Sequence, residues 1–251
     1  MVTRKDWVGG VFFLFFLLLP VAAFAQAPLA DGGTSPLALV ALLAGMALLP
    51  FLLIMVTSFV KVAVVLSILR TAIGAQQVPP NQIITGLAIL LSVYIMAPVG
   101  EDMYAELQPY LDQYDAGELT VNWESLEEVT EVVGAPLKSF LLKHASEGDR
   151  ALLFELAMEM RTEEQREGLT DEDFLIIIPA FVVTELKAAF TIGFILFVPF
   201  IIVDLVIANI LLSLGMHMLS PTTISLPFKL LLFVLVDGWY LVVKGLILGY
   251  V

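Results

Sequence analysis

The stretch that decides the fold is residues 174–251, which read FLIIIPAFVVTELKAAFTIGFILFVPFIIVDLVIANILLSLGMHMLSPTTISLPFKLLLFVLVDGWYLVVKGLILGYV. Its runs of Leu, Ile, Val and Phe lack the alternation of a β-strand and are typical of membrane-spanning helices. An isolated charge at the centre of a bilayer costs roughly 2.5–3.5 kcal/mol. Three acids and three bases nevertheless lie in this stretch, so we expect them to pair within or between subunits. They are Glu185, Lys187, Asp204, Lys229, Asp237 and Lys244.

The composition of the whole chain also indicates a membrane protein. Of its 251 residues, 59% are hydrophobic and 15% are charged, whereas soluble domains average about 45–50% and about 25%. The chain contains no cysteine, which excludes disulfides and thiolate metal sites. We therefore expect an all-α, multi-helix integral membrane protein.

Most of the negative charge is concentrated in one segment. Residues 101–173 hold 20 acids and 5 bases, a balance of −15, so the rest of the chain, at −13 − (−15) = +2, is nearly neutral. Leu137, Phe140 and Leu141 follow helical spacing in this segment. We predict a small helical acidic segment outside the cytoplasm. Such a block disfavours nucleic acid and anionic lipid headgroups as its partners.

The N-terminus has the three parts of a secretory signal. Arg4 and Lys5 precede a short apolar core, and Ala23-Phe24-Ala25 forms a small-residue cleavage site. We predict a signal peptide over residues 1–25, cleaved after Ala25 so that Gln26 becomes the first residue. The alternative is an uncleaved first transmembrane helix. Either directs the chain across the bacterial plasma membrane.

Prolines and glycines suggest the boundaries of the remaining segments. We expect N-terminal apolar helices in 26–100, with a second apolar segment ended by Pro98-Val99-Gly100. The acidic segment follows in 101–173. The C-terminal apolar segment, 174–251, is too long for one straight span. We expect Pro179 and Pro199 to bend or break it, a connection over 215–227, and a final helix over 228–251.

Two cations lie in the first apolar segment. Lys61 and Arg70 fit the positive-inside rule if Gln26 starts outside and the acidic segment lies outside again. Long basic side chains can extend from an apolar helix to the membrane surface. We interpret Lys61 and Arg70 as anchors at the inner face.

The charges of the last third need partners from other helices. Glu185 and Lys187 do not share a helix face, since they are two residues apart. Our hypothesis is that Glu185 meets Lys229, and that Lys187 meets Asp204 or Asp237. The alternative is a stand-alone secondary transporter or ion channel that uses Glu185, Lys187 and Asp204 as an ion relay. The equal number of bases favours pairing.

The turn Met216-His217-Met218 has a chemical character of its own. Thioether side chains are flexible and fill irregular gaps, so several copies around an axis would form a compliant seal. Simple packing at a helix end is one alternative, and a soft copper site is another. His144 is the only other histidine, which argues against a metal. We find no catalytic motif and expect no enzyme and no cofactor.

Several motifs of the chain are long and specific. They are Ser58-Phe59-Val60-Lys61, Leu69-Arg70, Gln76-Gln77-Val78-Pro79-Pro80-Asn81, Pro179-Ala180-Phe181, Glu185-Leu186-Lys187-Ala188-Ala189-Phe190, Ile192-Gly193-Phe194, Pro199-Phe200, Asp204-Leu205-Val206, Leu226-Pro227-Phe228-Lys229 and Asp237-Gly238-Trp239. Together they resemble the FliP/SctR family of type III protein export gates. The resemblance covers nearly the whole chain from about Leu37.

The resemblance implies a pore subunit that conducts unfolded export substrates across the bacterial inner membrane. It implies a ring of identical subunits, a pentamer, that joins FliQ/SctS-like and FliR/SctT-like membrane proteins largely on the periplasmic side. In this family the apolar segments fold as bent helical hairpins. Its methionine-rich turn acts as a pore gasket and maps onto Met216, His217 and Met218. His217 replaces a usual methionine, and a ring of imidazoles would make closure pH-sensitive.

The motifs bear on which secretion system the chain serves. The cleavable signal is similar to flagellar members, which belong to the basal body. The stretches around Glu185-Leu186-Lys187 and Pro221-Thr222-Thr223 are more similar to injectisome members. Together they favour the base of an injectisome slightly.

Overall fold

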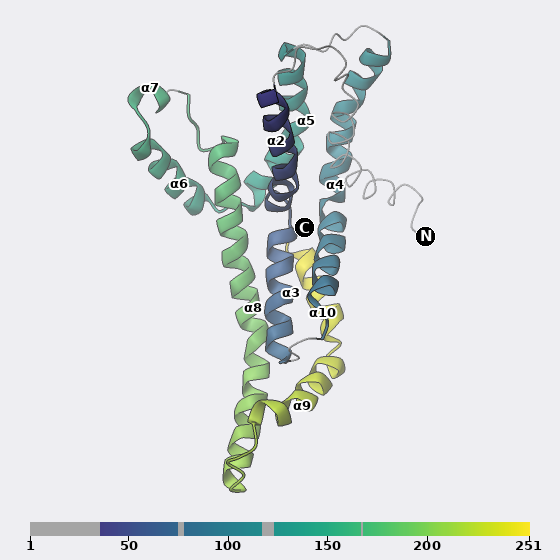
Figure 1. Ribbon diagram of the computed structural model, residues 1–251, viewed down its shortest axis with the longest axis vertical. Coiled ribbons are helices and arrows are strands. Elements are labelled where there is room, and N and C mark those ends of the chain that lie inside the picture. Colours follow the sequence, from purple (N-terminus) through teal and green to yellow (C-terminus); the bar gives the residue numbers. More distant parts are fainter. Residues whose placement is uncertain (1–35, 75–77, 117–122, 167) are drawn as a thin grey trace. The chain divides into compact units, whose positions relative to one another are not determined.

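The computed structural model describes residues 36–74, 78–116, 123–166 and 168–251. Every regular element in these ranges is a helix, which confirms the all-α fold (Figure 1). The predicted signal peptide and its cleavage site at Ala25 and Gln26 lie outside the described residues. In chain order the helices are α2 (Pro36–Met55), α3 (Phe59–Ile73), α4 (Asn81–Asp115), α5 (Trp123–His144), α6 (Glu147–Met160), α7 (Glu163–Arg166), α8 (Phe174–Ser213), α9 (Pro221–Leu235) and α10 (Gly238–Leu248).

The long apolar helices are those of an integral membrane protein. Asn81–Tyr114 of α4 and the whole of α8 are each long and apolar enough to cross a bilayer. Two pairs of consecutive helices are long and apolar enough only when each pair is counted as one bent span. These pairs are Ala44–Met55 with Phe59–Ile73, and α9 with α10. The described residues therefore contain two to four candidate spans. In the most apolar 18-residue stretch of α8, only 11% of the residues are buried within the chain. Because soluble monomers rarely expose such surfaces, lipid or other proteins must cover it.

The two longest helices run through prolines that we expected to interrupt them. α4 continues past Pro98 to Asp115, and α8 is unbroken through Pro179 and Pro199. A proline removes one helical hydrogen bond. Membrane helices tolerate this loss because neighbouring groups and small local adjustments satisfy the freed carbonyl. The predicted helix end at residues 98–100 was therefore wrong, and Pro179 and Pro199 do not break the C-terminal segment into separate helices.

The real helix ends fall elsewhere. The first apolar segment is interrupted at residues 56–58, between α2 and α3. α9 begins at Pro221 rather than at residue 228, with proline in the first turn, where its missing N–H costs nothing. The expected single final helix is two helices, because α9 and α10 meet at 60° around Asp237. Asp237 takes a left-handed conformation with φ 52°, which ends the first helix.

The chain divides into two compact units, and α4 and α8 each run from one into the other. Unit 1 is Met1–Ser58 with Val93–Thr184, and unit 2 is Phe59–Ser92 with Glu185–Val251. The acidic residues 101–173 belong to unit 1 and are mostly helical, in the second half of α4 and in α5, α6 and α7. The motif residues of the C-terminal third, from Glu185 onward, belong to unit 2.

In unit 1, aromatic and polar contacts hold the short helices against the start of α8. The rings of Phe140 on α5 and Phe181 on α8 lie 5.8 Å apart. The hydroxyl of Thr184 donates to a carboxylate oxygen of Asp149 at 2.9 Å and accepts the backbone N–H of Ser146 at 3.0 Å. These bonds fix the beginning of α6 to α8, and the buried Asp149 is thereby satisfied.

In unit 2, α3 is the central helix. Val62, Val65, Leu66 and Leu69 are all buried, at the i, i+3, i+4, i+7 spacing of one helix face. Opposite α3, the backbone of α8 comes close at Gly193. A Cβ added there would meet Cδ1 of Ile68 at 2.4 Å, so the absence of a side chain permits this close packing.

Candidate functional site

The first cluster of buried charges in unit 2 contains Lys61, Glu185 and Tyr250. The Nζ atom of Lys61 on α3 lies 3.0 Å from a carboxylate oxygen of Glu185 on α8. The Tyr250 hydroxyl donates to the other carboxylate oxygen, and the Lys61 ammonium lies 3.8 Å from the centre of the Tyr250 ring. Glu185 is 2% exposed and Lys61 7%. We call these three residues the Lys61 cluster.

The Lys61 cluster joins three segments that are far apart in the sequence. Lys61 lies in the first turn of α3, Glu185 lies within α8, and Tyr250 follows α10. A buried carboxylate without a partner would cost several kcal/mol. Here it has an ammonium and a phenol, and the cation also lies against an aromatic ring. The cluster therefore fixes the C-terminus to α3 and α8.

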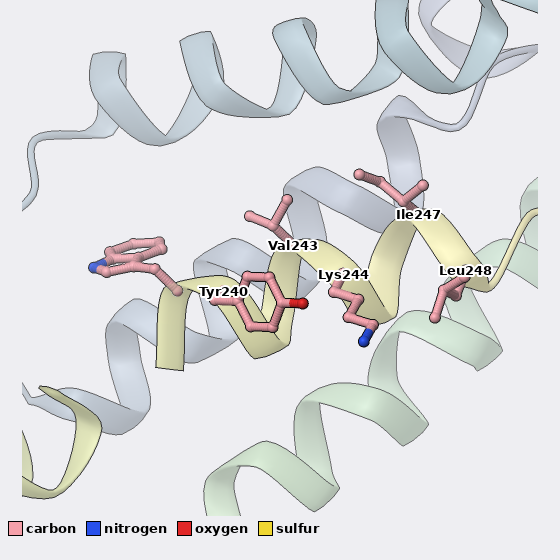
Figure 2. A pocket seen from close by; sticks show the side chains of 6 residues that line it. Tyr240, Val243, Lys244, Ile247 and Leu248 are labelled. Carbon is pink, nitrogen blue, oxygen red and sulfur yellow. The ribbon is translucent and has the colours of Figure 1, made fainter. Parts of the chain in front are cut away.

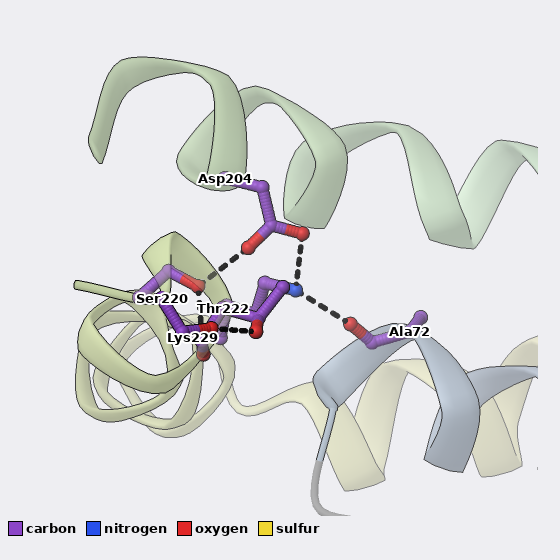
Figure 3. Close-up of polar contacts among 6 residues, drawn as sticks. Ala72, Asp204, Ser220, Thr222 and Lys229 are labelled. Atoms are coloured by element: carbon purple, nitrogen blue, oxygen red, sulfur yellow. Dashed lines mark hydrogen bonds and ion pairs between the residues drawn. The ribbon is translucent and has the colours of Figure 1, made fainter. Parts of the chain in front are cut away.

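A second cluster surrounds Asp204 (Figure 3). Lys229 of α9 places its Nζ 2.6 Å from a carboxylate oxygen of Asp204 on α8 and 3.3 Å from the carbonyl oxygen of Ala72 at the end of α3. The buried Ser225 hydroxyl donates to the other oxygen of Asp204. We call these four residues the Asp204 cluster. It connects α3, α8 and α9 through one lysine side chain.

These contacts show that α3 and α8 run in the same direction within unit 2. Lys61 meets Glu185, Ile68 meets Gly193, and the end of α3 at Ala72 reaches α8 through Lys229. Residues later in α3 therefore contact residues later in α8. The two charged clusters lie at the two ends of one close helix–helix contact.

The structure changes the expected pairing of the charges. Glu185 pairs with Lys61 rather than with Lys229, and Lys229 pairs with Asp204. Lys187 is exposed on α8, and Asp237 is exposed at the bend between α9 and α10. Glu185 therefore does not meet its expected partner, because the hypothesis did not consider a cation from the first apolar segment, and the expected pairing of Lys187 stays a prediction.

The two cations interpreted as inner-face anchors differ in position. Lys61 is buried and paired, so its ammonium does not extend to the surface of the chain, and that interpretation needs correction. Arg70 lies half-buried in the last turn of α3, and its guanidinium donates to the side-chain oxygen of Asn81. Arg70 therefore remains at the edge of the chain, where an anchor would lie.

Two buried members of the clusters were missed in the sequence. Tyr250 is one aromatic residue at the end of an apolar tail, and Ser225 is one hydroxyl in a turn-like stretch. Each matters because its hydroxyl donates to a carboxylate on α8, which is distant in the sequence. A pattern that could have indicated Ser225 is its position one helical turn before Lys229, which places both on one face of α9.

The sixth charge, Lys244, lies outside both clusters. Its Nζ is 5.5 Å from the centre of the Tyr240 ring, one turn earlier on α10. Figure 2 shows both side chains beside a hollow of about 470 Å³ lined by α10 residues alone. Lys244 is exposed, so its charge is not held in the core of the unit.

The Met216–Met218 turn is exposed between α8 and α9. Gly215 precedes it with φ +71°, a left-handed conformation that favours glycine at the end of a helix. Met216 is 45% exposed and Met218 98%, and His217 is also exposed. The turn thus presents flexible thioethers to whatever lies beyond this chain.

Helices with large uncovered apolar faces and intramembrane charges paired with one another define a structural component of a membrane assembly. Glu185 and Asp204 each contact a lysine and a hydroxyl from other segments, so these contacts hold the helices together. The chain belongs to the FliP family, whose model matches residues 42–246. It is a membrane component of type III secretion, and not an enzyme.

Similar proteins come from both flagellar and other secretion systems. The chain is 46% identical to the Yop proteins translocation protein R of Yersinia pestis, over 84% of this chain and 95% of that protein. It is 42% identical to the flagellar biosynthetic protein FliP of Bacillus subtilis, over 86% and 93%. It is 38% identical to the hypersensitivity response secretion protein HrcR of Ralstonia nicotianae, over 84% and 96%.

Proposed function

We propose that this chain is a pore-forming subunit of a type III protein export gate in the bacterial inner membrane, and that it conducts unfolded substrates. The observation that carries the proposal is the exposed Met216–Met218 turn at the end of α8. Flexible thioethers can adapt to one another and to a varied polypeptide. Several copies around an axis would therefore seal a pore and still yield to a passing chain.

The proposal includes the partners of the subunit. Identical copies form a ring, a pentamer, together with FliQ/SctS-like and FliR/SctT-like membrane proteins, largely on the periplasmic side of the membrane. The apolar faces of α8 that the chain leaves uncovered support contact with such partners. The two charged clusters keep α3, α8 and α9 together while the surroundings change. We propose the injectisome base as the location, with the flagellar basal body as the alternative.

Cysteine crosslinking tests the pore. Because the chain has no cysteine, Met218→Cys introduces its only thiol. We expect this variant to form disulfides between subunits in membranes and to crosslink to a stalled export substrate that carries a cysteine. Met160→Cys is the matched control, since Met160 is 86% exposed but lies at the end of α6.

The control decides how the result is read. Substrate crosslinks at position 218 and none at position 160 support a pore lined by the methionine turn. Equal crosslinking at both positions, or none at position 218 during active secretion, contradicts the proposal. A separate measurement tests the pH-sensitive closure expected from His217. The conductance of the His217→Met channel is compared with that of wild type between about pH 5.5 and 7.5, and an unchanged pH profile relative to wild type contradicts the expectation.

A further inference from the structure

A polar pocket and an apolar groove meet on the same side of unit 2. The pocket has a volume of about 940 Å³, and the groove about 620 Å³. Ser67, Thr71 and Phe197 line both, so the two spaces are adjacent. The groove and pocket are formed by α3 and α8, with α9 and the start of α4 at the polar end.

The pocket has a net positive charge. Its charged residues are Arg70, Lys229 and Asp204. Asp204 lies 2.6 Å from Lys229 and also accepts a hydrogen bond from Ser225, so its charge is compensated. The Arg70 guanidinium therefore sets the sign. It has five N–H donors and binds phosphate groups with two at once, so its bond to Asn81 does not use up its capacity.

Further hydrogen-bonding groups line the same pocket. They are Ser67, Thr71, Asn81, Thr222 and Thr223. Thr222 and Thr223 lie in the first turn of α9, where the positive end of the helix dipole favours an anion. The polar end of the site thus combines one guanidinium, hydroxyl groups and the positive end of a helix. This chemistry suits a phosphate diester with a polar headgroup.

The groove has the opposite character. It is lined by Ala63, Val64, Ile68, Phe190 and Phe194, along about 12 Å of α3. Phe190 and Phe194 are 63% and 69% exposed. Gly193 also lines the groove, and its backbone packs closely against Ile68 there. An acyl chain would cover these aromatic and aliphatic side chains.

We propose that unit 2 binds an anionic phospholipid, with its phosphate at Arg70 and one acyl chain along the groove between α3 and α8. The basis is that a cationic polar pocket lies beside an apolar groove and shares three lining residues with it, because neither a free phosphate nor a purely apolar partner needs both parts. The proposal does not depend on the proposed pore function.

The experiment measures which lipid stays with the purified secretion complex. The complex is incubated in mixed micelles that contain equal amounts of phosphatidylglycerol and phosphatidylcholine, repurified, and its retained lipids are quantified by mass spectrometry. We expect wild type to retain phosphatidylglycerol preferentially. One basic residue near an anionic headgroup corresponds to about a fivefold preference, which Arg70→Gln should abolish and Arg70→Lys should largely keep.

Two further variants separate the parts of the site. Lys244→Gln removes an exposed cation outside the pocket and should leave the ratio of the two lipids unchanged. Val64→Phe fills the groove and should reduce the retention of both lipids. Excess inorganic phosphate should not displace the bound lipid, since it cannot fill the groove. If phosphate displaces it fully, the site binds a free anion and the proposal is wrong.

Crosslinking on the wild-type complex keeps the test independent of variant folding. Phosphatidylglycerol with a photoreactive diazirine in its acyl chain should label residues 63–71 of α3 or residues 190–197 of α8. An unchanged lipid ratio in Arg70→Gln, or labelling confined to other helices, overturns the proposal. Crosslinks from a photoreactive residue at position 64 to a protein instead of lipid also overturn it, since a partner helix then occupies the groove.

Discussion

Removing Lys61 from the Lys61 cluster should destabilise the protein strongly. Glu185 is 2% exposed, so Lys61→Met leaves a buried carboxylate whose remaining polar partner, among the residues that the structure describes, is the Tyr250 hydroxyl. Breaking one side of a buried ion pair typically costs about 3–5 kcal/mol in the free energy of unfolding. Because the phenol remains, we expect a value near the lower limit, about 3 kcal/mol.

The double variant separates the charge from the packing. Lys61→Met combined with Glu185→Leu replaces both charges by apolar groups, which is often neutral or stabilising by about 1–4 kcal/mol. The Tyr250 hydroxyl then lacks its acceptor, which costs about 1–3 kcal/mol. These effects oppose each other, so we expect the double variant to lie within about 2 kcal/mol of wild type.

The assay is unfolding by SDS in mixed micelles, followed by the fluorescence of the three tryptophans. Lys244→Met is the control, since it removes an exposed lysine whose ammonium lies 5.5 Å from the centre of the Tyr240 ring, and it should cost less than about 1 kcal/mol. The reasoning is refuted if Lys61→Met costs no more than this control. It is also refuted if the effects of Lys61→Met and Glu185→Leu simply add, since a direct contact requires coupling.

Three further predictions use the same unfolding assay. Gly193→Ala places a methyl group 2.4 Å from Cδ1 of Ile68 and should lower the free energy of unfolding by about 1–3 kcal/mol. Gly245→Ala has open space around the new methyl group and should raise it by about 0.5–1 kcal/mol. Equal effects would contradict the close helix contact. Asp204→Asn leaves a buried ammonium without its carboxylate and should cost about 3–5 kcal/mol, and a loss below about 1 kcal/mol would show that the pair is not desolvated. Asp237→Val should cost about 1–2 kcal/mol because φ is 52°, while Asp237→Gly should be nearly neutral; a valine as stable as glycine would speak against this bend.

The sequence was sufficient for the fold class because apolar composition and helical runs follow directly from the bilayer. It also indicated that charges in apolar helices must find partners, and Glu185, Asp204 and Lys229 do. The partners themselves were not predictable. Lys61 lies 124 residues before Glu185 in the sequence, and only the packing of α3 along α8 brings them together.

The proline predictions show a second limit. Pro98, Pro179 and Pro199 interrupt helices in water, yet α4 and α8 continue through them. Whether a proline ends a helix depends on what surrounds the lost hydrogen bond, and the local sequence does not contain that information. One break that does occur, at Asp237, comes from a residue that tolerates the left-handed conformation.

The two clusters also limit how α3 can move. A slide of α3 along α8 by one helical turn is a shift of about 5.4 Å. Such a shift would separate Lys61 from Glu185 and Ala72 from Lys229 simultaneously, and would drive Ile68 past Gly193. Intermediate positions would leave two buried charges unpaired. The two clusters therefore fix a single translational register of α3 along α8 in unit 2.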